Sequence, residues 1–361
     1  MRIALVVDDF HGGSGNIAQL MALNFNEEHD VSMVLTNLHS EPRYNLNGIK
    51  IYDPAKIGSH SNKALGLFSL VRNIGRILKK EIKAELIISF VDNNNTMVCL
   101  SNLFNKTPII VAERSNPLVI FPKKPWDTLR RIAYRRANVV TVQFDIFKNF
   151  DGGRFADKVR VTSNIVKKAQ NVKNDWKSGK TKFVTCGRLA NVKRMDLMIE
   201  LFESAQKKCP DIELHIFGDG PNREKLQNLI AEKNLESKVF LRGYCDDVHN
   251  TLLDYDAYLM TSKQEGFPNS LCEAMAIGLP SVSFACHEGI TELAEFGESG
   301  FAVPDGDKDA FVEKMILLAN DEPLRESMGK NAMKISERYS NENIMKQWYE
   351  CITDAMKKSK K

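Results

Sequence analysis

The sequence predicts an α/β protein made of two doubly wound domains, each with a parallel sheet covered by helices on both faces. Its 361 residues are too many for one ordinary hydrophobic core and suit two domains of roughly 150 to 200 residues. Short apolar, β-branched runs alternate with segments of helical period, and strands apolar on both sides are typical of covered parallel sheets. The alternation stops and restarts once, which predicts two sheets.

A polar segment separates the two series of expected strands. This segment, 165–180, has few large aliphatic residues and is interpreted as a linker. Beyond about residue 306 the pattern is purely helical. We therefore expect domains over 1–164 and 181–338, followed by a helix over 339–361 that packs back on the first domain. The strands are expected at 2–7, 31–37, 85–90, 108–112, 138–142 and 158–162, and then at 182–186, 213–217, 238–241, 257–261, 281–284 and 300–303.

Composition indicates a soluble globular protein. Hydrophobic residues make up 43% and charged residues 27% of the chain, which are ordinary values. The first apolar run, 3–7, is too short for a signal peptide, and no later run approaches the roughly 20 residues of a membrane span. A cytoplasmic location is expected. The seven cysteines form no C-x-x-C pair and no zinc pattern with histidine, so we expect no structural metal.

The net charge of +4 is unevenly placed. Residues 1–165 carry 22 Lys and Arg against 15 Asp and Glu, while the remainder carries 28 against 31. The densest basic patch lies on an expected helix near residues 126–136. It is either a solvated helix face or a helix lying on an anionic membrane surface, two interpretations that the sequence leaves open. The patch consists of Lys123, Lys124, Trp126, Arg130, Arg131, Arg135 and Arg136.

Two glutamates eight residues apart, Glu265 and Glu273, stand out in the stretch EGFPNSLCEAMAIGLP, residues 265–280. The Gly and Pro that follow Glu265 keep it on a loop. A helix is expected to begin near Asn269 or Ser270, with Glu273 on its first turn. Helix-start amides bind phosphates, and a carboxylate beside them accepts hydrogen bonds from vicinal hydroxyls. The structural alternative is a capping box, in which Ser270 and Glu273 only satisfy the amides of the helix start.

Three further loops follow expected strands in the second half. Arg188 and Lys193 lie on the loop after the strand ending at residue 186, where two cations can grip neighbouring phosphates or simply be solvated. Residues 218–221, Gly-Asp-Gly-Pro, fit a turn followed by a helix with Pro at its first position. Residues 287–292 lead into another helix start. Ligands of open α/β sheets bind beyond the carboxyl ends of the strands, so these loops define the candidate site.

These motifs together resemble those of the retaining glycosyltransferases of family 4, which have the GT-B fold. The resemblance rests on Gly-Arg-Leu-x3-Lys, Gly-Asp-Gly-Pro, Phe-Leu-Arg-Gly at 240–243, Glu-Gly-Phe-Pro-x-Ser-x-x-Glu and Gly-x-x-Glu at 289–292, in this order. It covers 181 to about 305, and the ordered set is far more specific than any single motif. It implies two Rossmann-like domains that face each other across a cleft, with the active site between them.

The resemblance also assigns roles to individual residues. It implies that Arg188 and Lys193 bind the donor diphosphate and stabilise its departure, with Glu265 beside the donor sugar. Glu273 would hold the ribose, and the amides of Ser270 and Leu271 would contact the distal phosphate. The remaining expected donor-binding residues are Asn269, Gly289, Gly218 and Gly15.

The first half resembles the family less closely. Gly13 and Gly15 lie in His-Gly-Gly-Ser-Gly after the first strand, where such enzymes have a glycine-rich loop near the transferred group. The Gly-Gly-Ala-Glu-Arg version common in relatives is absent, because Asn and Ile replace the charged pair. The segment 112–117, Ala-Glu-Arg-Ser-Asn-Pro, is similar to segments of glycan-building members. Glu113, Arg114 and Gly13 are therefore acceptor-side candidates, and a structural salt bridge is the alternative role for Glu113 and Arg114.

The resemblance implies a metal-independent, retaining transfer of a hexose or N-acetylhexosamine from a nucleoside-diphosphate sugar, with UDP favoured. The acceptor would be a glycan or a polyprenyl-diphosphate-linked glycan, and no nucleic-acid partner is expected. A nucleotide-sugar epimerase of the same fold is the first alternative. The second is a nicotinamide-dependent dehydrogenase, because 13–18 fits G-x-G-x-x-A. That fingerprint needs an acid at the end of the second strand, where this chain has Thr36 and Asn37.

Overall fold

The computed structural model describes residues 1–57, 63–119, 126–176, 179–245, 247–294 and 298–359. It divides the chain into two compact units. The first unit consists of 1–164 and 342–361, and the second of 165–341.

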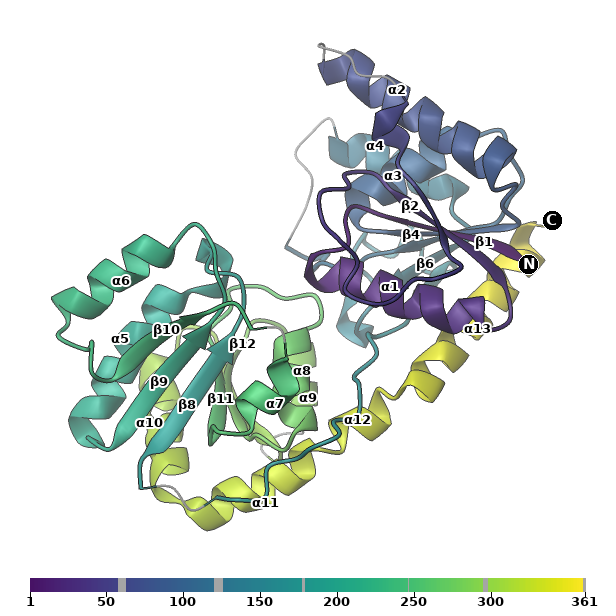
Figure 1. Ribbon diagram of the computed structural model, residues 1–361. Helices are drawn as coiled ribbons and strands as arrows, with labels where there is room; N and C mark the ends of the chain where they lie inside the picture. Colours follow the sequence, from purple (N-terminus) through teal and green to yellow (C-terminus); the bar gives the residue numbers. More distant parts are fainter. Residues whose placement is uncertain (58–62, 120–125, 177–178, 246, 295–297, 360–361) are drawn as a thin grey trace. The chain divides into compact units, whose positions relative to one another are not determined.

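The first unit is built on a parallel sheet with the strand order β3-β2-β1-β4-β5-β6-β7 (Figure 1). The order reverses direction between β1 and β4, which is the switch point of a doubly wound sheet. Strands β1, β2 and β4 are almost wholly apolar and buried, as expected for a sheet covered on both faces. The strands are β1 (Arg2–Val7), β2 (Asp30–Leu35), β3 (Lys50–Tyr52), β4 (Leu86–Phe90), β5 (Ile109–Ala112), β6 (Val139–Val142) and β7 (Val159–Val161). The helices are α1 (Gly12–Asn26), α2 (Lys63–Arg76), α3 (Asp92–Ser101), α4 (Trp126–Ala133) and α13 (Asn341–Ser359).

The second unit repeats this topology with the order β10-β9-β8-β11-β12-β13. Its strand arrows run in one direction in Figure 1, so the carboxyl ends of the strands lie at one edge of the sheet. The strands are β8 (Thr181–Cys186), β9 (Ile212–Phe217), β10 (Val239–Gly243), β11 (Ala257–Met260), β12 (Ser281–Ala285) and β13 (Gly300–Pro304). The helices are α5 (Met195–Lys208), α6 (Arg223–Glu232), α7 (Val248–Leu252), α8 (Asn269–Ala276), α9 (Glu288–Leu293), α10 (Lys308–Asn320), α11 (Glu322–Ala332) and α12 (Ile335–Arg338).

Every strand expected from the sequence is present, with ends displaced by at most two residues. The sequence did not predict β3, a three-residue edge strand whose residues are exposed or half-buried. It has no apolar run to reveal it, because a short edge strand buries little.

The segment expected to be a linker is a packed part of the second unit. Lys173 forms a buried ion pair with Asp256 at 3.1 Å. Trp176 is buried and packs against Gly329. A Cβ atom at residue 329 would lie 2.6 Å from the indole ring of Trp176. These contacts hold the segment against the strands and helices that follow it.

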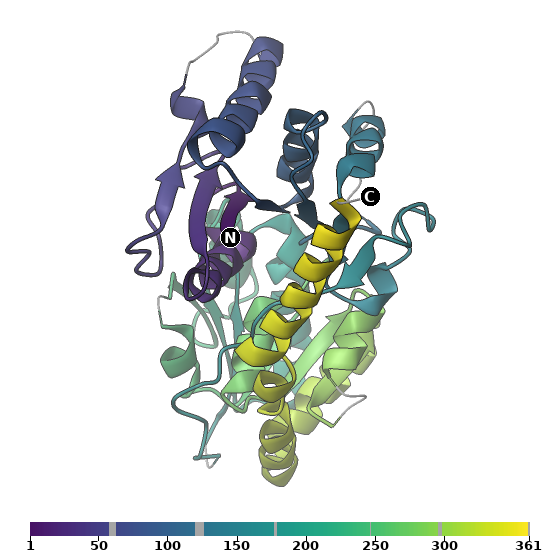
Figure 2. The same cartoon turned by 90° about the vertical axis from the view of Figure 1, so that its right-hand side faces the viewer.

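Helix α13, yellow in Figure 2, packs on the first unit through aromatic side chains. Trp348 is buried, with its ring centroid 6.2 Å from that of Phe90 in β4. The ring of Tyr349 packs edge-on against that of Phe25 in α1, with the ring centroids 5.8 Å apart. Asp354 forms an ion pair with Arg160. The described residues include no helix with the length and hydropathy of a membrane span.

Candidate functional site

The loops after β8 and β9 and the end of strand β10 are joined by backbone hydrogen bonds at the carboxyl edge of the second unit's sheet. The Leu189 amide donates to Asp219 at 2.9 Å, and the Gly218 amide donates to Gly243 at 2.6 Å. Gly218 has φ +130°, and a side chain there would lie 2.0 Å from the Gly187 carbonyl oxygen. The first Gly of Gly-Asp-Gly-Pro is thus required by the close approach of two loops.

Helix α6 begins at Arg223, two residues after Pro221. The expected turn with Pro at the first helical position is therefore not what the structure shows. Gly220, with φ +158°, also allows two loops to approach closely, since a side chain there would lie 2.6 Å from the Leu189 carbonyl oxygen.

The two cations predicted on the β8 loop have different surroundings. Lys193 ends a 3₁₀ turn and donates to Glu265 across the sheet edge, with Nζ 2.6 Å from Oε1. Both side chains are largely buried, at 22% and 11% exposure. Arg188 is exposed and has no ion-pair partner among the described residues. The structure thus brings Lys193 and Glu265 together, which the sequence did not predict, and leaves a second positive charge exposed on the same loop.

Arg194 positions this loop, and sequence reasoning missed it. Its backbone is left-handed, with φ 49°, and its guanidinium donates to the carbonyl oxygens of Thr261 and Ser262 beyond β11. It also forms an ion pair with Asp305 beyond β13. The Thr261 hydroxyl donates back to the carbonyl oxygens of Lys193 and Arg194, both at 3.0 Å. Nothing in the sequence distinguishes Arg194 from a solvated neighbour of Lys193.

The start of α8 excludes the capping-box interpretation. Its N-cap is Pro268, and Ser270 is the second helical residue. The Ser270 hydroxyl accepts a hydrogen bond from Tyr258 Oη at 2.8 Å instead of capping the helix. The first hydrogen bond between residues four apart in α8 runs from the Cys272 amide to the Pro268 carbonyl oxygen. The amides of Ser270 and Leu271 come before this bond in the chain.

Glu273 is half-buried and is the fifth residue of α8, just past the first turn on which it was expected, and Glu265 lies on the loop before the helix. Tyr258 links this helix to β8, because its hydroxyl also accepts from the Cys186 amide at 3.2 Å. It is 1% exposed. The sequence showed it only as one more aromatic residue in a strand.

His287 caps α9 and is held neutral. Its Nδ1 accepts from the Gly289 amide at 3.1 Å, and burial lowers the pKa of the imidazole to about 4. The amide of Gly289, a predicted donor contact, is thus engaged within the protein. Glu292, in the same motif, forms an ion pair with Arg338.

In the first unit, the glycines after β1 differ in accessibility. Helix α1 begins at Gly12, Gly13 is exposed, and Gly15 is buried. A side chain on Gly15 would lie 2.4 Å from the carbonyl oxygens of Asp9 and Phe10, so this glycine allows the loop to pack on the helix. At the end of β2, where a dehydrogenase needs an acid, Thr36 donates to Asn94 Oδ1 at 2.7 Å.

Glu113 and Arg114 both have structural partners, as the alternative interpretation proposed, but they do not pair with each other. Glu113 is 3% exposed, accepts from the Tyr134 hydroxyl and lies 3.6 Å from Arg130. Burial raises the pKa of its carboxyl group. Arg114 donates to the Thr162 carbonyl at 2.7 Å and lies over the Trp348 ring at 5.2 Å.

The basic patch around α4 is not one exposed surface. Arg130 is 3% exposed between Glu113 and Asp127, and Arg136 donates to the carbonyl oxygens of Asn102, Asn105 and Thr107. Two arginines of the patch, Arg130 and Arg136, therefore hold the fold together and do not belong to a solvated or membrane-facing surface. Trp126 donates to Asn93 at 2.6 Å, and Arg131 pairs with Asp127 at 2.8 Å. Lys123 and Lys124 lie outside the described residues, and Arg135 is exposed.

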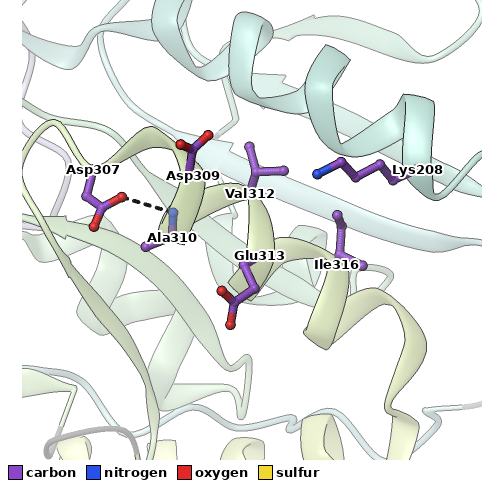
Figure 3. A pocket seen from close by; sticks show the side chains of 7 residues that line it. All are labelled: Lys208, Asp307, Asp309, Ala310, Val312, Glu313 and Ile316. Atoms are coloured by element: carbon purple, nitrogen blue, oxygen red, sulfur yellow. Dashed lines mark hydrogen bonds between the residues drawn. The ribbon is translucent and has the colours of Figure 1, made fainter.

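A cavity of about 480 Å³ lies between α5 and α10 in the second unit (Figure 3). It is lined by acidic side chains and Lys208, and Asp307 in its wall accepts from the Ala310 amide at 3.0 Å, which caps α10. No residue of the candidate site lines it. Its acidic lining is unsuited to an anionic ligand.

Comparison with known proteins shows what this chain is similar to. Residues 166–335 match the family described as glycosyl transferases group 1. The chain is 31% identical over 209 residues to a poly(ribitol-phosphate) α-N-acetylglucosaminyltransferase of Staphylococcus aureus, covering 57% of this chain and 41% of the relative. The chain is 25% identical, over 98% of its length and 99% of the relative, to a Campylobacter jejuni enzyme. That enzyme is named GalNAc-α-(1→4)-GalNAc-α-(1→3)-diNAcBac-PP-undecaprenol α-1,4-N-acetyl-D-galactosaminyltransferase.

The fold agrees with that of a solved structure. The crystal structure of a mutant of S. aureus TarM, in complex with fondaparinux, α-GlcNAc-glycerol and UDP, superposes with a TM-score of 0.81 at 17% identity. The match covers 97% of this chain and 99% of TarM. The chain thus has the GT-B fold, with two parallel-sheet units. The residues that match glycosyl transferases group 1 lie in its second unit.

Proposed function

We propose that this protein transfers a hexose or N-acetylhexosamine from a UDP-sugar to a hydroxyl of a glycan or lipid-linked glycan, with retention of the anomeric configuration. The observation that supports this most is the arrangement at one sheet edge. Lys193 and Glu265 are paired, Arg188 is exposed on the loop that carries Lys193, and the amides at the start of α8 precede its first helical bond. Cations and helix-start amides suit a diphosphate, and carboxylates suit sugar hydroxyls.

Each residue has a distinct role in the proposed reaction. Arg188 and Lys193 neutralise the diphosphate, and the amides of Ser270 and Leu271 bind its distal phosphate. Glu273 accepts hydrogen bonds from the ribose hydroxyls. Glu265, oriented by Lys193, faces the donor sugar.

We infer a front-face substitution. The bond between the anomeric carbon and the phosphate oxygen breaks while the acceptor oxygen bonds to that carbon from the same side. The leaving diphosphate takes the proton of the acceptor hydroxyl, so no protein nucleophile is assigned. Fixed positive charges carry out the charge neutralisation that a divalent cation would otherwise supply.

The named relatives favour particular substrates. Both transfer an N-acetylhexosamine in α linkage, and the acceptors in their names carry phosphate groups. The solved TarM complex contains UDP. The cation surplus of residues 1–165 suits an anionic acceptor, and the exposed Gly13 lies after β1 on the acceptor-binding unit. A polyprenyl-diphosphate acceptor would place the reaction at the inner face of the cell membrane.

Transfer from UDP-N-acetylglucosamine and UDP-N-acetylgalactosamine to a polyprenyl-diphosphate glycan tests the proposal. We expect UDP release that depends on the acceptor and, by proton NMR, an α-linked product. A β-linked product would contradict retention. Sugar epimerisation without any acceptor would support the epimerase alternative instead.

A further inference from the structure

Helix α2 of the first unit has one packed face and one uncovered face. Its packed face includes Ile74, buried completely, and Asn73, whose side chain donates to the carbonyl oxygens of Pro54 and Ile57. The helix continues into a π-helical turn, 77–81, whose first two residues are also buried. The exposed residues recur at intervals of three or four, so they form one stripe along the helix. This outer stripe comprises Leu65, Phe68, Arg72, Arg76 and Lys79.

The outer stripe is divided into an apolar end and a basic end. Phe68 is 71% exposed and Leu65 57% exposed, and Leu67 beside them is 38% exposed. Arg72 follows after one helical turn, and Arg76 and Lys79 continue the row. Large apolar side chains are seldom left this exposed in adjacent turns unless the surface binds something.

The charge of this segment is entirely positive. Residues 63–80 contain five basic residues and no acidic one. The acid that follows, Glu81, lies 3.7 Å from Arg76, and both side chains are accessible to solvent. An exposed ion pair of this kind contributes little free energy, so Arg76 can exchange Glu81 for another anion.

The apolar end of the outer stripe lies at the edge of the first unit's sheet where the strands have their carboxyl ends. Helix α2 begins on the carboxyl-end side of the sheet because it follows β3, and the loops after β1 and β5 lie at the same edge. The loop after β5 adds two more exposed apolar residues, Leu118 and Val119, at 38% and 56% exposure. Figures 1 and 2 both show α2 beside α3 and extending further from the sheet than α3 and α4.

We infer that the outer stripe of α2 binds an anionic phospholipid bilayer. Phe68 and Leu65 enter the boundary between headgroups and acyl chains, while Arg72 and Arg76 contact lipid phosphates. The cationic end of the stripe complements the anionic headgroups of such a bilayer, and the apolar end complements the acyl chains beneath them. The inference rests on the proposed function only in that a lipid-linked acceptor gives the contact its purpose.

Vesicle flotation of the full chain tests this. The vesicles are phosphatidylcholine alone, or phosphatidylcholine with roughly one third phosphatidylglycerol. We expect binding only to the anionic vesicles, and a loss of roughly tenfold or more in the partition coefficient for Phe68→Ser/Leu65→Ser and for Arg72→Gln/Arg76→Gln. The matched control is Phe104→Ser, which removes a fully exposed Phe from the loop after α3 and is expected to bind like the wild type.

Calorimetric titration with UDP separates this inference from the proposed function, since the α2 variants leave the second unit unchanged. Unaltered UDP affinity with lost flotation supports the inference. Three results would overturn it: no flotation of the wild type, equal flotation of the α2 variants, or equal binding to phosphatidylcholine alone. A concentration-dependent dimer that Phe68→Ser abolishes, in sedimentation without lipid, would also overturn it by identifying a second copy as the occupant.

Discussion

Replacing Lys193 with Ala is expected to lower kcat for sugar transfer by roughly 100- to 1,000-fold, the effect of removing one preorganised group that stabilises a developing charge. Its ammonium group is fixed against Glu265 and largely buried, so it is already oriented before the donor diphosphate departs. The variant also frees Glu265, which is then less precisely placed at the sugar. Steady-state kinetics at saturating UDP-sugar measure the effect.

Lys263 provides the matched control. It is exposed on the loop before Glu265, and Lys263→Ala removes a charge of the same kind from the same region. We expect it to keep wild-type kcat. A Lys193→Ala enzyme with full kcat would show that neither the charge of Lys193 nor its pairing with Glu265 is needed for transfer, and the proposed stabilisation of the leaving group would then be wrong.

Replacing Arg130 with Met is expected to lower the free energy of unfolding by about 3 to 5 kcal/mol, the usual cost of leaving a buried charge without its partner. The guanidinium lies between Glu113 and Asp127 at 3.6 and 3.0 Å and is 3% exposed. Urea denaturation measures the loss. The double variant Arg130→Met/Glu113→Gln should recover part of it, because no buried carboxylate then lacks a cation.

The effect of Arg130→Met should also depend on pH. Burial already raises the pKa of Glu113, and loss of the nearby cation raises it further. A carboxyl group with a folded-state pKa above its unfolded value stabilises the fold at low pH and loses that contribution as pH rises. The destabilisation should therefore grow as the pH rises above the ordinary pKa of a glutamate side chain. Arg131→Met, which breaks a more exposed pair with Asp127, should cost less than about 1 kcal/mol and change little with pH.

The strands and their order of appearance followed from the sequence because buried parallel strands are continuous apolar runs. The position of the candidate site followed too, since loops after parallel strands share one edge. What could not be predicted is which side chains pair across that edge. Lys193 and Glu265 are 72 residues apart in the sequence. The contacts of Arg194 depend on its left-handed backbone conformation, which no local sequence pattern predicts.

The first unit shows the same limit for charged residues. Glu113 precedes Arg114 in sequence, yet its cation is Arg130, because Arg114 points toward Thr162 and the α13 tryptophan. The arginines in and just after α4 indicated a surface, but Arg130 is buried and Arg136 donates to three backbone carbonyl oxygens. In α2, exposure of Phe68 could not be predicted, since an apolar residue in an amphipathic pattern is normally buried.

Calorimetric titration with UDP, GDP, ADP and NAD, using wild type and Glu273→Ala, tests directly whether this sheet edge binds a sugar nucleotide. We expect UDP to bind and NAD not to bind, and we expect the variant to lose about 1 to 3 kcal/mol of UDP binding free energy through lost charged hydrogen bonds. Unchanged UDP affinity in a folded variant would remove Glu273 from the donor site. Binding of NAD alone would contradict the assignment of this sheet edge to a sugar nucleotide.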